Sequence, residues 1–159
     1  MKKFLSFMII LLLIFSSIIL YADNQEKTDQ NFSGFKYKIT PKDEGWKTFT
    51  TRDQMVQACS IPSEILKKMT TKEVVDAVVD FPLFITNMYA YSTDEEAIKA
   101  LLDISDAFTE LTTRKDSGKE LQNKISYFEK ANISEAEKSL YIKAIEILLT
   151  EEYIWKSVE

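Results

Sequence analysis

The sequence contains no histidine, and this absence excludes more chemistry than any other feature of its composition. Without histidine there is no Ser-His-Asp or Cys-His nucleophile pair, and the commonest protein ligands of zinc are missing. Three glycines are too few to build a phosphate-binding loop or a dinucleotide-binding turn. An Asp-rich calcium loop of the EF-hand type is also missing. We therefore expect no cofactor and no metal site.

A single cysteine, Cys59, excludes an intramolecular disulfide. Its apolar neighbours include Met55, Val56 and Ile61. Because free cysteine is among the most buried residue types, we expect Cys59 to be a small buried side chain rather than a reactive thiol.

Basic residues are outnumbered, with 20 Lys and Arg against 25 Asp and Glu, and they form no cluster. Phosphate binding depends on Lys and Arg, so this balance argues against nucleic acid as a partner. It also argues against docking on an anionic membrane surface.

The longest apolar run, Phe4 to Tyr21, is the strongest signal in the chain. Two lysines precede it, and Ala22 followed by Asp23 fits a signal-peptidase cleavage point. We predict a signal peptide over residues 1–22 and a secreted or cell-envelope location. The alternative is an uncleaved helix that anchors the chain through residues 4–21, since such a run can cross the roughly 30 Å of hydrocarbon in a bilayer. Contact with the membrane is expected through this segment alone.

The next segment, residues 23–45, is polar with few aliphatic side chains, and we expect a flexible tether or an extended arm. Phe35–Ile39 alternates apolar and polar residues, which is typical of a strand. Whether it forms a hairpin with Trp46–Phe49 stays open, because a lone two-stranded hairpin is marginal.

Four capping-box patterns predict helix starts, each a Ser or Thr followed three residues later by Gln or Glu. They are Thr51–Gln54, Thr70–Glu73, Thr93–Glu96 and Ser134–Glu137. Together with apolar stripes at helical spacing, they predict an all-α domain over residues 46–159, a compact bundle of about five or six helices.

Three stretches carry more specific expectations. Ile98 to Leu111 forms one continuous helical stripe. The β-branched stretch Val74–Asp80 favours a strand by composition, but its valines recur four apart, so we predict a helix that ends near Asp80 because Pro82 follows. The last helix, from about Glu135 to Lys156, is apolar over much of its circumference and is predicted to lie in the middle of the bundle.

The most aromatic part of the domain is the segment Phe81–Tyr91. Apolar runs of this kind are usually buried, so a core helix is the simpler interpretation. The functional interpretation is a binding surface formed by Phe84, Tyr89 and Tyr91.

Carboxylates are the remaining catalytic candidates, and Asp103, Asp106 and Glu110 project from one face of the expected helix. A solvated face explains them, with Glu110 paired to Arg114 one turn later. The alternative is a pair of catalytic carboxylates, which needs a cleft between them.

A resemblance rests on Ile61-Pro62, Leu66-Lys67-Lys68-Met69-Thr70-Thr71, Pro82-Leu83, Tyr89-Ala90-Tyr91, Glu110-Leu111 and Arg114-Lys115-Asp116. With these elements, about half of the chain resembles an uncharacterised family of exported proteins of Gram-positive bacteria. The resemblance implies export and brings no activity, cofactor or catalytic residue with it.

These observations favour an exported, non-catalytic helical domain that binds an extracellular protein, a peptide or a cell-wall component. The alternative function is a carboxylate-dependent hydrolase of cell-wall or sugar material. The two hypotheses differ in a structural feature, because the hydrolase requires opposed carboxylates across a groove and the binding domain requires an exposed apolar patch.

Overall fold

A computed structural model of the chain describes residues 35–155, apart from the side chains of Tyr153 and Trp155. These residues belong to one compact unit, Gly34–Glu159. The predicted signal peptide of residues 1–22, its cleavage point between Ala22 and Asp23, and the alternative anchor of residues 4–21 lie outside the described residues.

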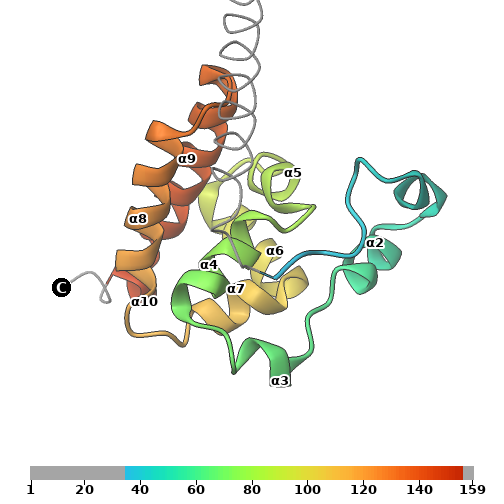
Figure 1. Ribbon diagram of the computed structural model, residues 1–159, viewed down its shortest axis with the longest axis horizontal. Helices are drawn as coiled ribbons and strands as arrows, with labels where there is room; N and C mark the ends of the chain where they lie inside the picture. Colours follow the sequence, from blue (N-terminus) through green and yellow to red (C-terminus); the bar gives the residue numbers. More distant parts are fainter. Residues whose placement is uncertain (1–34, 156–159) are drawn as a thin grey trace, which may run out of the picture. The chain divides into compact units, whose positions relative to one another are not determined.

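All regular structure in residues 35–155 is helical (Figure 1), which confirms the all-α prediction. Five of the helices in this part have seven residues or more, in line with the expected five or six. In chain order the elements are the 3-10 helix η1 (Glu44–Thr48), α2 (Arg52–Ala58), α3 (Ser63–Leu66), α4 (Thr71–Val79), α5 (Phe84–Met88), α6 (Asp94–Ile104), α7 (Asp106–Leu111), α8 (Ser117–Lys130), α9 (Glu135–Leu149) and α10 (Glu152–Trp155).

Helix α4 lies at the centre of the bundle, packed against α7 and α8. It begins at a complete capping box, in which Thr70 Oγ1 accepts from the Glu73 amide and Glu73 Oε2 accepts from the Thr70 amide. Its valines are buried on all sides, and it ends at Asp80 as predicted. Helical spacing and the cap therefore prevail over the β propensity of this stretch.

Helices α8 and α9 form an antiparallel pair (Figure 1), joined by the stacked rings of Phe128 and Tyr141 at 4.7 Å between centroids. The prediction of one central helix over residues 135–156 is wrong in two respects. The helix ends at Leu149, with Thr150 Oγ1 donating to the Ile147 carbonyl, and α10 follows separately. One side of α9 is also exposed, including Leu140, so α9 flanks the core that α4 occupies.

The stripe from Ile98 to Leu111 belongs to two helices rather than one. The chain is extended at Ser105, whose Oγ accepts a hydrogen bond from the Phe108 amide and starts α7. Serine competes for the backbone in this way, which makes it a poor residue inside a helix and a good one at its start. The apolar stripe continues because both helices bury the same side.

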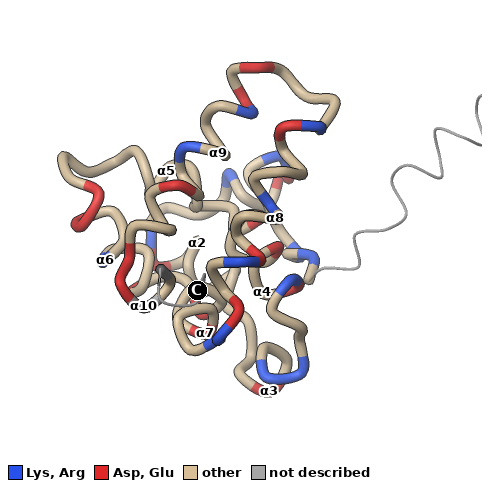
Figure 2. Tube along the Cα trace, turned by 90° about the vertical axis from the view of Figure 1, so that its left-hand side faces the viewer, with Lys and Arg blue, Asp and Glu red and all other residues tan. Residues whose placement is uncertain are grey.

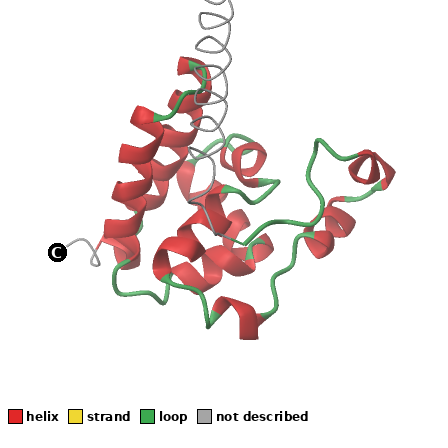
Figure 3. Cartoon of the chain, viewed as in Figure 1, coloured by secondary structure: helices red, strands yellow, loops and turns green. Residues whose placement is uncertain are grey.

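Residues 35–43 form an arm without helix or strand on the bundle, while residues 23–34 of the predicted tether or arm lie outside the described residues. The Tyr37 hydroxyl donates to the Ala77 carbonyl of α4 at 2.8 Å, and the Tyr37 ring contacts Phe81. Figure 3 shows no strand in the described chain, and residues 44–48 form η1, so the hairpin alternative is wrong. The arm and the helices share one unit, without a boundary near residue 46.

Charges of both signs are interspersed along the described trace (Figure 2). Among the helices of residues 35–155, none combines the length and the apolar character that a bilayer crossing requires.

Candidate functional site

The predicted aromatic surface is divided by the fold. Phe84 is fully buried in the core, so its assignment to a binding surface is wrong and the core interpretation applies to it. Tyr89 and Tyr91 are exposed. Position in α5 explains the difference, because Phe84 begins this helix against the bundle and the two tyrosines follow its end.

Tyr91 is turned toward α2. Its hydroxyl oxygen accepts from Arg52 Nη1 at 3.0 Å, and Arg52 Nη2 donates to Asn87 Oδ1 at 2.7 Å. The buried Asn87 in turn donates to the Ala97 carbonyl of α6 at 2.8 Å. Tyr91 thus lies at the end of a polar chain that ties α2 to α5 and α6.

Tyr89 is turned toward α9, whereas Tyr91 binds Arg52 of α2, so the hydroxyls of the two tyrosines are directed to different helices. The Tyr89 hydroxyl donates to the Leu140 carbonyl at 2.9 Å. Burial raises the pKa of Tyr89, with the charge of Glu146 adding to the effect, so the hydroxyl keeps its proton. Tyr89 is 45% exposed and Leu140 is 43% exposed, and we call these two residues, joined by that hydrogen bond, the Tyr89–Leu140 face.

An open hollow of about 510 Å³ lies along α9, near the same end of the bundle. Four of its charged residues form ion pairs within the helix, with 2.9 Å between Lys138 and Glu135 and 3.8 Å between Lys143 and Glu146. Its lining is Glu129, Glu135, Lys138, Ser139, Ile142, Lys143 and Glu146. Because Glu146 also acts on Tyr89, the hollow and the Tyr89–Leu140 face belong to neighbouring parts of α9.

Of the three carboxylates considered as catalytic candidates, Asp106 and Glu110 have structural partners. Asp106 Oδ2 accepts from the Ile61 amide at 2.9 Å and from Ser60 Oγ at 2.7 Å, which fixes the chain before α3. Glu110 pairs with Arg114 at 2.8 Å, as predicted, and Asp103 is exposed on the surface.

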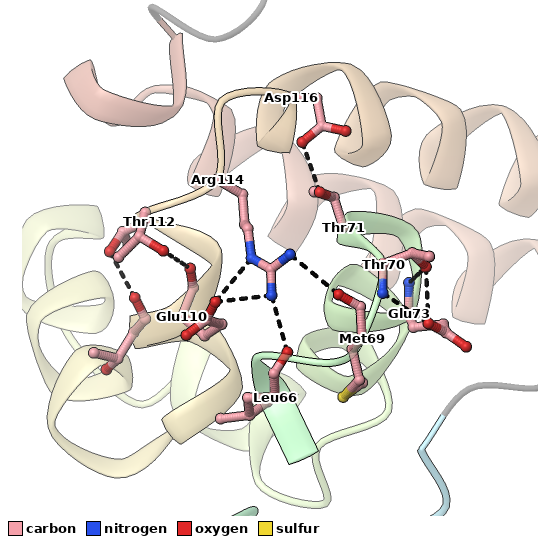
Figure 4. A network of polar contacts seen from close by, with 11 residues as sticks. Leu66, Met69, Thr70, Thr71, Glu73, Glu110, Thr112, Arg114 and Asp116 are labelled. Atoms are coloured by element: carbon pink, nitrogen blue, oxygen red, sulfur yellow. Dashed lines mark hydrogen bonds and ion pairs between the residues drawn. The ribbon is translucent and has the colours of Figure 1, made fainter. Parts of the chain in front are cut away.

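Arg114 is the centre of the network in Figure 4. Its guanidinium binds Glu110 and also donates to the carbonyls of Leu66 and Met69, at 2.9 and 3.1 Å. Glu110 therefore holds the guanidinium that binds the end of α3. In the contacts described for Glu110 and Asp106, neither carboxylate faces a second carboxylate across a groove. The spacing of Glu110 and Arg114 was readable from the sequence, but the two carbonyls were not.

Cys59 is buried at the end of α2, as predicted, and burial raises the pKa of its thiol to about 11. In the described part of the chain, no three metal-ligating side chains gather into a group that could hold an ion.

A buried ion pair is the polar feature that sequence reasoning missed. Asp76 of α4 contacts Lys124 of α8 at 2.9 Å and Lys72 at 2.9 Å. Lys124 Nζ lies 5.1 and 5.4 Å from the ring centroids of Tyr127 and Phe128. The available signal was a carboxylate among four valines, since a charged residue inside an apolar helix requires a partner.

Comparison of the chain with protein-family models, with curated proteins and with solved structures finds no match.

Proposed function

We propose that this chain is an exported, non-catalytic helical domain that binds a protein, a peptide or a cell-wall component through the Tyr89–Leu140 face. The basic start, the apolar run and the Ala22–Asp23 junction support export. The single observation that carries the binding proposal is the fixed, exposed ring of Tyr89.

A tethered tyrosine suits recognition for an entropic reason. The bond from its hydroxyl to the Leu140 carbonyl restricts the ring before any partner arrives. Binding then loses less side-chain freedom than it would with a mobile ring. Tyrosine is enriched among the residues that dominate interface energies, because it presents a large apolar area together with a polar tip.

The surroundings favour a partner that is partly apolar and partly polar. Leu140 adds a second exposed apolar side chain, and Glu146 supplies a negative charge that acts on Tyr89. An apolar centre with a charged rim is the usual composition of a protein-binding surface.

The test is capture of partners from the envelope fraction of the native cell, with purified protein immobilised as bait. Tyr89→Ala should reduce capture of the bound species at least several-fold. Tyr89→Phe, which keeps the ring and loses the tether, should reduce it less.

Tyr127→Ala is the matched control, because Tyr127 is also 45% exposed but lies on α8. Circular dichroism of each variant should show an unchanged helical spectrum. Equal loss of capture for Tyr89→Ala and Tyr127→Ala would contradict a specific role for this face.

The alternative, a carboxylate-dependent hydrolase, predicts a different result. Cell-wall or sugar material should then be cleaved by the purified protein, with activity lost in Asp103→Ala or Glu110→Ala. The bonds of Glu110 to Arg114 and of Asp106 to the chain before α3 favour the binding domain, because those carboxylates already serve the fold.

A further inference from the structure

The ion pair between Asp76 and Lys124 differs from the other ion pairs of residues 35–155 by its burial. Lys124 is 6% exposed and Asp76 is 2% exposed. In the other pairs of this part of the chain, at least one side chain is more than a fifth exposed. Two buried ions have lost most of their hydration, so a reaction that removes both charges is favoured at this place.

Condensation of the ammonium with the carboxylate is such a reaction. We propose that Nζ of Lys124 and Cγ of Asp76 are joined by an amide bond in the folded protein, formed after folding without an enzyme and with release of one water.

The geometry supplies the approach that this reaction needs. Nζ of Lys124 lies 2.9 Å from Oδ1 of Asp76, and each residue lies on a helix packed against the other. Reacting groups that a fold holds in this way reach effective concentrations on the order of 10⁵–10⁸ M, far above that of the water that opposes condensation.

The step balances without an oxidant or a co-reactant. The Nζ lone pair forms the bond to Cγ, and the bond from Cγ to Oδ2 breaks with its electron pair on oxygen. Of the protons on the Lys124 ammonium, one stays on the amide nitrogen and two end on Oδ2, which leaves as water. The opposite charges of the two side chains cancel.

Lys72 and Asp80 are placed to move those protons. Lys72 Nζ donates to Oδ2, the leaving oxygen, at 2.9 Å. Asp80 follows Asp76 by one turn of α4 and interacts electrostatically with both reacting groups. Partial burial raises the pKa of the Asp80 carboxyl, Lys124 opposes this and Asp76 adds to it, so Asp80 is a stronger base than an ordinary aspartate. It can take the proton that Nζ loses before attack.

The bond would connect α4 to α8 across 48 positions of sequence. A link over such a distance restricts the unfolded chain as a disulfide does. This chain has one cysteine and so forms no disulfide of its own.

The test compares intact masses of the wild-type chain and Lys124→Arg, produced in the same way. Arginine keeps the charge opposite Asp76, but its guanidinium does not condense. The mass of the variant should exceed that of the wild type by the Lys-to-Arg difference plus one water. Because both proteins have the same N-terminus, processing there cancels.

Digestion of the wild type supplies the second measurement and needs no variant. It should yield one branched peptide that joins the segments around residues 76 and 124. Lys138 and Glu135 form the internal control, since they also lie 2.9 Å apart but Glu135 is 88% exposed, and they should be recovered unlinked.

Asp80→Asn should lower the linked fraction several-fold at equal times after refolding, and an unchanged fraction would remove Asp80 from the step. A wild-type digest in which both segments are recovered unlinked, at the full sequence mass, would overturn the proposal.

Discussion

Helices α2 and α4 begin with the same capping pattern, but they lie in opposite environments. Each starts at a complete capping box, at Thr51 and at Thr70. Of its nine residues α4 buries seven, whereas neither α2 nor the preceding η1 buries any. The comparison teaches that a cap determines where a helix begins, while the side chains that follow determine how firmly the bundle holds it.

The two regions are also held by different forces. Apolar contact is the main force on α4, because its four valines are all buried. The α2 segment, defined as residues 44–58, is tied to the bundle by the bonds of Arg52 to Asn87 and Tyr91. Segments with few buried apolar contacts open locally at low free energy. We therefore expect the α2 segment to open while the bundle stays folded.

The largest expected effect comes from a comparison of a fully buried leucine, Leu148, with a half-buried methionine, Met55. Leu148→Ala should lower the free energy of unfolding by about 2–5 kcal/mol, because Leu148 is fully buried against the core. Met55→Ala, on the half-buried side of α2, should cost less than about 1 kcal/mol, in the range of surface substitutions. Urea denaturation of both variants gives the comparison, and equal losses would show that the α2 segment belongs to the same cooperative unit.

Arg114→Ala tests a polar tie inside the bundle. The change leaves the carbonyls of Leu66 and Met69 and the carboxylate of Glu110 without their donor, at a cost of about 1–3 kcal/mol. Arg114→Lys should recover part of the loss, because a single ammonium cannot reproduce the fork of the guanidinium. Thermal unfolding measures both, and a loss of less than the scatter among surface variants would contradict this role.

Arg52→Ala tests the tie of the α2 segment. Loss of the two bonds to Asn87 and Tyr91 should raise the native-state alkylation rate of Cys59 about tenfold or more, since hydrogen bonds to a charged group contribute roughly 1.5–3 kcal/mol. In the closed state the reaction is slow, because burial covers the thiol and raises its pKa to about 11.

The urea midpoint of Arg52→Ala should change little by comparison. Arg114→Ala is the control, since it weakens the bundle without touching α2. Faster labelling of Cys59 in Arg114→Ala than in Arg52→Ala would show that Cys59 reports global unfolding.

The smallest effect concerns Asp80, at the end of α4. Its carboxyl has a pKa above the ordinary value in the folded state, so the ionised form destabilises the fold. Below the unfolded pKa of about 3.9 the carboxyl is protonated in both states, and the fold does not carry this cost. The stability is lost as the pH rises through the folded pKa. Asp80→Asn should thus raise the melting temperature slightly at neutral pH when it is compared in the Lys124→Arg background, in which no amide bond to Asp76 forms. The gain should disappear once the pH falls below the unfolded pKa. A gain that persists at low pH would assign the effect to packing instead.

Three places in the chain show what the sequence predicts and where it fails. Thr70 with Glu73 predicted the start of α4 correctly, because a cap depends on neighbours in the chain. Ser105 continued an apolar stripe and concealed the break between α6 and α7, since periodicity does not register a serine that turns to the backbone. Phe84 and Tyr89 were equally aromatic in sequence, and the packing of α5 alone separated them into core and surface.

The sequence by itself determined the helical class, the starts of α2, α4, α6 and α9, the burial of Cys59 and the pairing of Glu110 with Arg114. All of these follow from residues within a few positions of one another. The tertiary structure alone decided that Arg114 binds two carbonyls of the α3 end, that Asp76 meets Lys124, and that the Tyr89 hydroxyl reaches Leu140. The partners in these contacts are more than forty positions apart, and helix packing brings them together, so no local pattern encodes them.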